Sequence, residues 1–410
     1  MTLTLMHDRL RAAFWRWGWL LPVVLPLATL AGRGLFNVLS SVYALWGLLS
    51  LWSVPNVSVR AERLPVLLYG ALLATWLLSL PGAVDPERGL RLWLLVFAQS
   101  LVVLLLPLAL RNSARAAEQW FKALALTALL VLGVLYLMLF YQLSGISGEP
   151  FDPLTQMRED SLPFLLPFLL GGLWWHGGRR RGLWMLLAVL AMLTYAALAE
   201  GRAALLGLVV GLAVFGWAVL NWRWYLIFLV ALLALATGIA INSGPFRKAE
   251  MDVTRPLDAF TAGRTIIWRQ ALAQPPARPW RGVGMGNAVH ATEVLRFELG
   301  GVTHQVKHLH NVLLDAWYET GLLGVAALLA LIGTVFGRLA GRWRHLSDLD
   351  RQRSGVLLAA ALALLAAGSL SFSYTGRQFA CYFFSCLGGL SYYGCRVKWP
   401  AAACTDPDKP

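Results

Sequence analysis

Three closely spaced histidines late in the chain are its most chemically suggestive residues. His304, His308 and His310 lie in the run from Gly282 to Gly324, just before an apolar segment that opens with Asn311. A neutral imidazole accepts a proton near pH 7, so His310 at the mouth of this segment suits a general base. Ionisable side chains are costly to place beside a hydrophobic span, which makes function the default explanation for the cluster.

Two arginines supply a second chemistry. Arg202 stands at the head of an apolar run, and Arg264 lies at the start of a predicted short helix from Gly263 to Leu272. Arginine presents a planar fork of N–H donors that matches a phosphate group, whereas lysine offers a point charge. The N-terminus of the predicted helix would add free N–H groups to the same anion site. With His310, these residues indicate an enzyme that binds a phosphorylated, lipid-linked substrate and activates a hydroxyl group.

The histidines also allow a different chemistry, a metal site with three imidazole ligands. His304 and His308 are four residues apart, a spacing that places both on one helix face. The stretch has no His-Glu-x-x-His pattern and no cysteine partner. We therefore favour the general base and expect neither a metal nor another cofactor.

A glycine-rich turn precedes the histidines. Gly282-Val283-Gly284-Met285-Gly286 has the look of a nucleotide-binding loop, but no strand precedes it and no βαβ unit surrounds it. We interpret it as a tight turn that returns the chain to the membrane.

Composition identifies the setting of these residues as a membrane. The 410 residues are 58% hydrophobic and 14% charged, with a mean hydropathy of +0.62, whereas soluble domains carry about 25% charged residues. The net charge of +14 lies between apolar runs. It is therefore interpreted as a topology signal, and no nucleic-acid partner is expected.

Apolar runs of about 20 residues, the length that spans a bilayer, indicate about twelve helices. They are predicted near 14–31, 34–52, 64–81, 91–110, 119–141, 161–176, 182–199, 203–220, 223–242, 309–336, 355–373 and 378–396. The predicted class is an all-α polytopic membrane protein. Its expected division is helices 1–9 in residues 1–242, a periplasmic loop in 243–308, helices 10–12 in 309–397, and a cytoplasmic tail in 398–410.

The distribution of arginine and lysine predicts the orientation. With the N-terminus in the cytoplasm, the short outer segments hold few basic residues, and the cytoplasmic segments hold many more. The outer ones are Arg33, Arg88, Arg91, Arg158, Arg202 and Arg377. Both termini are therefore expected in the cytoplasm. The long loop from Ser243 to Lys307 is basic as well, but long loops translocate largely regardless of charge, and an outer basic patch suits an anionic ligand or lipid headgroups.

Two further segments are predicted on the outer side. The predicted helix in the long loop places Ile267, Trp268, Ala271 and Leu272 on one face, which would suit a helix lying on the membrane surface. The acidic loop from Gln142 to Ser161 should form a polar cap, and nothing in its spacing favours a metal site.

Three sequence pieces resemble the O-antigen ligase and polymerase superfamily of bacterial inner-membrane proteins. His310-Asn311 is followed, nine residues later, by Gly321-Leu322-Leu323-Gly324, which resembles the ligases' His-Asn…Gly-x-x-Gly signature. Gly263-Arg264 with Trp268, and then Pro279 to Gly284, resemble the family's loop pattern. Gly201-Arg202 at the head of a span is the third piece. The order of the pieces, the topology and the length agree, so the resemblance covers nearly the whole chain.

The resemblance implies a GT-C-like fold and an inverting, metal-independent glycosyltransferase in lipopolysaccharide biosynthesis. Such a ligase moves glycan from undecaprenyl pyrophosphate to a sugar hydroxyl of lipid A–core on the periplasmic side of the inner membrane, among membrane lipids. His310 would be the general base, and Arg202 and Arg264 would bind the pyrophosphate. The candidate supporting residues are Asn311, His308, Arg281 and Asp315.

Other functions stay open on the sequence alone. A polymerase of the same superfamily would join repeat units on the lipid carrier. A transporter or flippase for an anionic lipid should carry basic residues inside its spans to line a path. Here they gather at span ends and in one loop, which favours an enzyme at the outer face.

Overall fold

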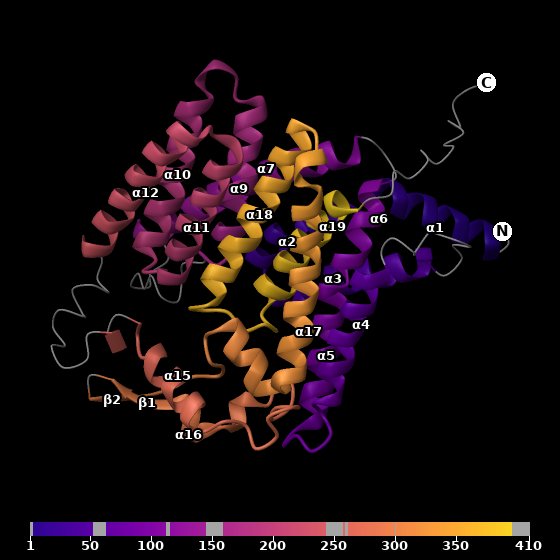
Figure 1. Ribbon diagram of the computed structural model, residues 1–410, viewed down its shortest axis with the longest axis vertical. Coiled ribbons are helices and arrows are strands. Elements are labelled where there is room, and N and C mark those ends of the chain that lie inside the picture. The colour runs from indigo at the N-terminus through magenta and orange to yellow at the C-terminus, as the bar shows by residue number, and fades with distance from the viewer. Residues whose placement is uncertain are drawn as a thin grey trace.

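The computed structural model describes residues 3–51, 63–111, 115–144, 159–242, 257–258, 261–299 and 301–395. Its first half consists of helices (Figure 1): α1 Leu3–Trp17, α2 Leu20–Ala31, α3 Arg33–Leu51, α4 Arg63–Leu78, α5 Pro86–Ser100, α6 Val102–Arg111, α7 Ala116–Leu143, α9 Leu162–His176, η2 Gly178–Arg180, α10 Arg181–Leu198, α11 Arg202–Val219 and α12 Trp222–Asn242. The second half holds α15 Arg264–Ala273, η3 Ala288–His290, α16 Thr292–Leu295, β1 Arg296–Leu299, β2 Val302–Gln305, α17 Val312–Arg342, η4 Trp343–His345, α18 Asp348–Gly368, the π-helix η5 Gln378–Phe383 and α19 Phe384–Gly394.

The helices confirm an all-α polytopic membrane protein. Within the described residues, six helical segments are long and apolar enough to cross a membrane, and a bent pair formed by α1 and α2 would make seven. Residues 63–78, 162–176 and 222–235 form shorter apolar helices. The number of twelve spans stays a prediction.

Two of the predicted helices are each divided into two. The segment 14–31 bends by 72° between α1 and α2, where Gly18 lies at the break and Pro22 lies in the first turn of α2. Proline fits the first turn of a helix but cannot continue a preceding one, because it lacks an N–H donor. The segment 91–110 divides at Leu101, between α5 and α6.

Close helix packing determines where the head of α11 lies. Helix α11 packs along α18, and a Cβ atom at Gly207 of α11 would stand 2.8 Å from the carbonyl oxygen of Ala363. Gly355 of α18 faces Ala218 just as closely. Small residues allow membrane helices to approach in this way. The packing brings Arg202, at the head of α11, to the end of the bundle where α18 terminates.

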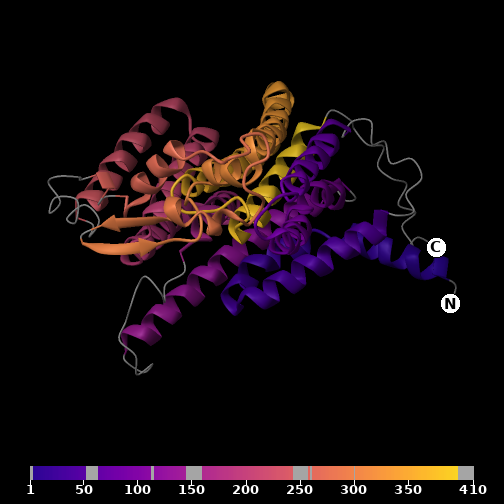
Figure 2. The same cartoon turned by 90° about the horizontal axis from the view of Figure 1, so that it is seen from below.

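The long loop forms a small folded cap with its own core (Figure 1). Its buried residues are Ile267, Ala271, Ala288, Val294, Leu295, Phe297, Leu309 and Tyr318. The antiparallel pair β1–β2, with Phe297 opposite His304, lies at one edge of the molecule (Figure 2). The sequence pattern predicts short helices here and does not indicate this hairpin. Helix α15 packs Ile267 and Ala271 into the cap, whereas Leu272 is 64% exposed. The predicted apolar face of this helix is therefore only partly buried, and the buried part contacts the cap.

Several predictions fall outside the described residues. They are the start of the long loop at residues 243–256, the tail at 398–410, and residues 145–158 of the acidic loop.

Candidate functional site

Arg264 is positioned by the preceding residue, Gly263, which occupies a position where no residue with a side chain fits. Gly263 has a φ of +79°, in the left-handed region, and a Cβ atom there would stand 2.0 Å from the ring of Phe297. An L-residue would meet both a backbone penalty and a collision. Gly263 thus lets α15 begin directly against the hairpin, with Arg264 as its first residue.

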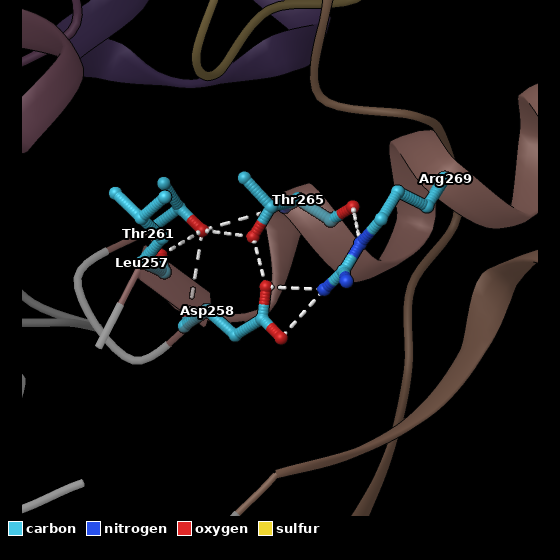
Figure 3. Close-up of polar contacts among 5 residues, drawn as sticks. All are labelled: Leu257, Asp258, Thr261, Thr265 and Arg269. Carbon is cyan, nitrogen blue, oxygen red and sulfur yellow. Dashed lines mark hydrogen bonds and ion pairs between the residues drawn. The ribbon is translucent and has the colours of Figure 1, made fainter. Parts of the chain in front are cut away.

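A buried carboxylate anchors the same helix start (Figure 3). Asp258 is 3% exposed, and both of its oxygens accept bonds from the guanidinium of Arg269 at 2.6 Å. The hydroxyl of Thr265 donates to Asp258 at 2.5 Å, and Thr261 bonds Thr265 at 2.9 Å. A charge-assisted pair in a partly buried site is directional as well as strong. These contacts hold the first turns of α15 and so the backbone of Arg264.

The N–H groups at the start of α15 are already used, which corrects the expectation of an anion site built on them. The N–H of Arg264 donates to the carbonyl of Thr261, and that of Thr265 to the Thr261 hydroxyl, both at 3.3 Å. The N–H groups of Ile266 and Ile267 donate to the carbonyl of Gly263. Any anion binding at this helix start would therefore rely on the guanidinium of Arg264.

One hydrogen bond ties α15 to the histidine segment. The indole Nε1 of Trp268 donates to the carbonyl oxygen of Leu309 at 2.9 Å. Leu309 is fully buried in the core of the cap, between His308 and His310. Trp268 lies one turn after Arg264 on α15, so this bond brings the arginine and the two histidines to one place.

His308 and His310 form a close pair. Their ring centroids are 4.1 Å apart, and the N–H of His310 donates to Nδ1 of His308 at 3.1 Å. The φ of His310 is +53°, a strained value for a residue with a side chain. Strain of this kind persists where surrounding contacts impose it, and it clusters at functional sites. The Nδ1 atom of His310 is enclosed and bonds none of the described residues.

Burial and positive charge keep His310 neutral. Burial lowers its pKa to about 3, assisted by neighbouring His308 and the charge of Arg264, while a hydrogen bond with the Ser371 backbone acts in the opposite direction. The pKa of His308 is also lowered, mainly by burial and further by the charge of Arg264, while Asp315 acts in the opposite direction. Burial and the charge of Arg202 lower the pKa of Arg264 to about 10. Arg202, Arg264, His308 and His310 therefore lie within one electrostatic neighbourhood.

Asn311 and Asp315 hold the histidine segment against the start of α17 and the segment after α18. The Asn311 side chain caps α17 by accepting from the N–H groups of Leu313 and Leu314, and its Nδ2 donates to the carbonyl of Ser369 at 3.1 Å. Asp315 is fully buried and accepts from the N–H of Leu309 at 3.2 Å.

The hydroxyl of Ser373 also donates to Asp315. Asn311 and Asp315 thus connect the histidines to the segment that follows α18. Both act here as positioning residues, as does His308, which receives the N–H of His310.

The glycine-rich turn docks on a kink in α17. Gly321 has a φ of +68° inside the helix, and a Cβ there would stand 2.3 Å from the backbone of Trp280. The N–H groups of Val283 and Gly284 donate to the carbonyls of Tyr318 and Glu319 at 3.0 and 2.9 Å. The turn is therefore a structural clamp that pairs with freed helix carbonyls, in keeping with its interpretation as a turn.

Glu319 completes this clamp. It is 4% exposed, and its carboxylate accepts from the N–H of Gly286 at 2.8 Å, the N–H of Ala288 at 3.2 Å and the hydroxyl of Tyr374 at 3.0 Å. Sequence reasoning left its role open. The structure assigns it to holding the loop against α17, the same kind of role that Asp315 has.

Arg202 follows a tight turn that is packed against an acidic residue. Glu200 has a φ of +50°, and the N–H of Arg202 donates to its carbonyl at 2.9 Å. A Cβ at Gly201 would stand 2.5 Å from Cγ of Glu159. Burial, together with the neighbouring Asp160, raises the pKa of Glu159 to about 7. The sequence placed Glu159 in the acidic outer loop but did not indicate its contact with Gly201, because the two residues lie far apart along the chain.

Two predicted residues lie apart from this group. His304 is exposed on β2 and stacks on Phe297 at 5.3 Å. Arg281 is exposed in the turn that docks at Gly321, roughly 15 Å along α17 from Asn311 at about 1.5 Å of rise per residue. Within the described residues, no group of three or more His, Cys, Asp or Glu side chains is arranged to hold a metal ion.

Comparison with known protein families agrees with this site. Residues 187–329 match the sequence model of the family described as O-antigen ligase, and the matched segment includes Arg202, Arg264 and His310. No curated protein matches the chain. The family indicates a glycosyltransferase-like enzyme that works on lipid-linked glycans in a membrane. Residues 187–329 of the chain are therefore similar to the superfamily of O-antigen ligases and polymerases.

Proposed function

We propose that the protein is an O-antigen ligase that transfers glycan from undecaprenyl pyrophosphate to a sugar hydroxyl of lipid A–core. The observation that carries the proposal is the convergence of two arginines on a neutral histidine. The charge of Arg264 acts on His308 and His310, and that of Arg202 acts on Arg264. Phosphate binding and proton acceptance would thus occur in one place.

His310 is the general base in this proposal. Its lowered pKa leaves the imidazole uncharged at neutral pH, and Nδ1 bonds none of the described residues. A pKa near 3 describes a weak base in the substrate-free enzyme. A bound pyrophosphate would offset the charge of Arg264 and raise the pKa of His310, because a nearby negative charge favours the imidazolium form. Donor binding would thereby strengthen the base when it is needed.

Arg202 and Arg264 bind the donor pyrophosphate and stabilise the charge that grows as it leaves. Positively charged groups held in place before the reaction act most strongly on charge that develops in the transition state. The turns at Gly201 and Gly263 and the Asp258 anchor hold the two arginine backbones. Two neighbouring arginines repel each other when no anion is bound. This repulsion favours binding of a group with several negative charges, such as pyrophosphate.

The chemical step is a single displacement with inversion. The acceptor hydroxyl oxygen forms a bond to the anomeric carbon of the donor sugar while the bond from that carbon to the pyrophosphate oxygen breaks. The hydroxyl proton passes to an imidazole nitrogen of His310, and undecaprenyl pyrophosphate leaves with the bonding electron pair. The side chains of this site balance the reaction without a metal ion or another cofactor.

The proposal includes a topology. The cap and the site lie in the periplasm, both termini lie in the cytoplasm, and about twelve helices divide as predicted between residues 1–242 and 309–397. The asymmetry of basic residues supports this orientation. Leu272 is exposed on the cap, so a cysteine placed there should react with an impermeant thiol reagent in whole cells. Labelling only after lysis would reverse the orientation.

A reconstitution assay tests the ligase against a polymerase of the same superfamily. Purified protein is supplied with an undecaprenyl pyrophosphate-linked glycan and either lipid A–core or a second carrier-linked glycan. A ligase glycosylates lipid A–core. Growth of the carrier-linked glycan, with lipid A–core untouched, would identify a polymerase and refute the acceptor assignment.

A further inference from the structure

A cavity lies close to the candidate site, at the junction of α2 and α3. It has a volume of about 250 Å³ and is lined by Thr29, Leu30, Gly32, Arg33, Asp160, Ser161 and Arg377. None of these residues belongs to the arginine and histidine group described above. They come from the α2–α3 turn, the start of α9 and the segment before η5.

Two segments connect this cavity to the candidate site. Glu159 packs against the Gly201 turn beside Arg202, and the next residue, Asp160, lines the cavity. The segment after α18 receives the Asn311 side chain at Ser369 and reaches the cavity at Arg377. The cavity is therefore connected to the site through these two segments.

The lining suits a phosphorylated sugar. Arg33 and Arg377 supply two guanidinium groups, which match phosphate oxygens. The guanidinium of Arg377 lies over the ring of Phe36 at 5.7 Å, and its charge acts on Asp160. Asp160 and the Ser161 hydroxyl add the acceptor and donor groups that bind sugar hydroxyls.

An apolar strip runs along α3 from the cavity. Arg33 begins α3, and the exposed residues Leu35, Val38, Val42 and Leu45 follow it at helical spacing. Their exposed fractions lie between 47% and 60%. A polar cavity at the head of an exposed apolar helix face matches an amphiphile, with the headgroup in the cavity and the acyl chains along α3.

We propose that this cavity binds the phosphorylated sugar headgroup of the acceptor glycolipid, with Arg33 and Arg377 on its phosphate. The inference rests on the proposed ligase function, and it separates the two substrates. The donor pyrophosphate binds at Arg202 and Arg264, and the acceptor lipid enters from the side of α3. The acceptor sugar then reaches His310 past the segment that follows α18.

Binding to the full-length protein in nanodiscs tests the inference without any turnover. The probes are lipid A–core, enzymatically dephosphorylated lipid A–core, and phosphatidylglycerol. Arg33→Gln should weaken binding of lipid A–core about tenfold, the loss expected for a charge-assisted contact, and should leave the dephosphorylated probe unchanged. Arg33→Lys should recover part of the loss. The matched control is Arg91→Gln, since Arg91 is exposed and pairs with Glu87.

Transfer kinetics give the second readout. Arg33→Gln should raise KM for lipid A–core and leave KM for the donor unchanged. Equal effects of Arg33→Gln and Arg91→Gln would overturn the proposal, as would equal losses for phosphorylated and dephosphorylated probes. A rise in the donor KM would show that the cavity binds the donor instead. An equal loss of phosphatidylglycerol binding would show that it binds membrane lipids in general. Either result would contradict the proposal. Failure of the ligase proposal is distinguishable, because it removes transfer and leaves the binding measurements intact.

Discussion

The indole of Trp268 donates a hydrogen bond to the carbonyl oxygen of Leu309 at 2.9 Å, and this bond joins the two halves of the candidate site. Arg264 lies one turn before Trp268, and Leu309 lies between His308 and His310. The bond thereby sets the arginine helix against a histidine whose φ of +53° requires support from its surroundings.

Loss of this bond should slow transfer without unfolding the protein. Trp268→Phe keeps most of the ring volume and removes the N–H donor, so His310 would shift relative to Arg264. Misplacement by about 1 Å costs up to about 100-fold in rate, and we expect at least a tenfold fall in kcat. The control is Trp280→Phe, since Trp280 is 63% exposed. Equal transfer rates for the two variants would contradict the positioning role proposed for Trp268.

Removal of the proposed base should nearly abolish transfer. His310→Ala should lower kcat by about 10²- to 10⁴-fold, the usual contribution of general-base catalysis, in membranes that contain normal amounts of protein. His304→Ala is the matched control, because His304 is exposed on β2 and stacks on Phe297. Near-normal activity of His310→Ala would end its assignment as the base.

Lysine should not replace the two site arginines. Arg202→Lys and Arg264→Lys keep the charge and lose the planar fork, so both should raise the donor KM and lower kcat by about tenfold or more, since each bidentate phosphate contact is charge-assisted. Arg281→Lys should have little effect, because Arg281 is exposed in the turn at Gly321. Wild-type kinetics in both site variants would contradict bidentate phosphate binding.

The kink of α17 should depend on glycine. Gly321→Ala would place a Cβ at a φ of +68° and 2.3 Å from the backbone of Trp280, so it should destabilise the protein by about 2 kcal/mol or more. Gly333→Ala lies in the same helix with no atom near its Cβ position and should be neutral or slightly stabilising. Thermal unfolding in detergent compares the two, and equal melting temperatures would refute the clamp.

Glu159 should make stability depend on pH. Its pKa in the folded protein is raised to about 7, above the ordinary value near 4.5, so the folded protein favours the protonated acid. Its contribution is fully present below about pH 4.5 and is lost as the pH rises through 7. The difference in melting temperature between Glu159→Gln and wild type should therefore grow in favour of the variant between pH 5 and 8. A difference that stays constant over this range would place Glu159 in a solvated setting.

The amino-acid pattern is enough to predict the helical membrane class and the residue types of the site. Hydropathy is a local property, so the apolar run at 203–220 coincides with α11 to within a residue. The His-Asn and Gly-Arg pieces indicated the superfamily that the family match over residues 187–329 supports. These signals need only neighbours along the chain.

Tertiary structure decided which residues meet. The Trp268–Leu309 bond, the contact of Glu159 with Gly201 and the clamp of Glu319 on Gly286 join distant segments. Helical or strand periodicity carries no information about such pairs, because it reports only which face of an element is apolar. Periodicity alone therefore left the roles of Asp315 and Glu319 open and missed the β1–β2 hairpin. It also placed Leu272 on the same apolar face as Ile267 and Ala271, although only those two are buried in the cap. The contacts that decide these features form only once the cap has folded onto the bundle.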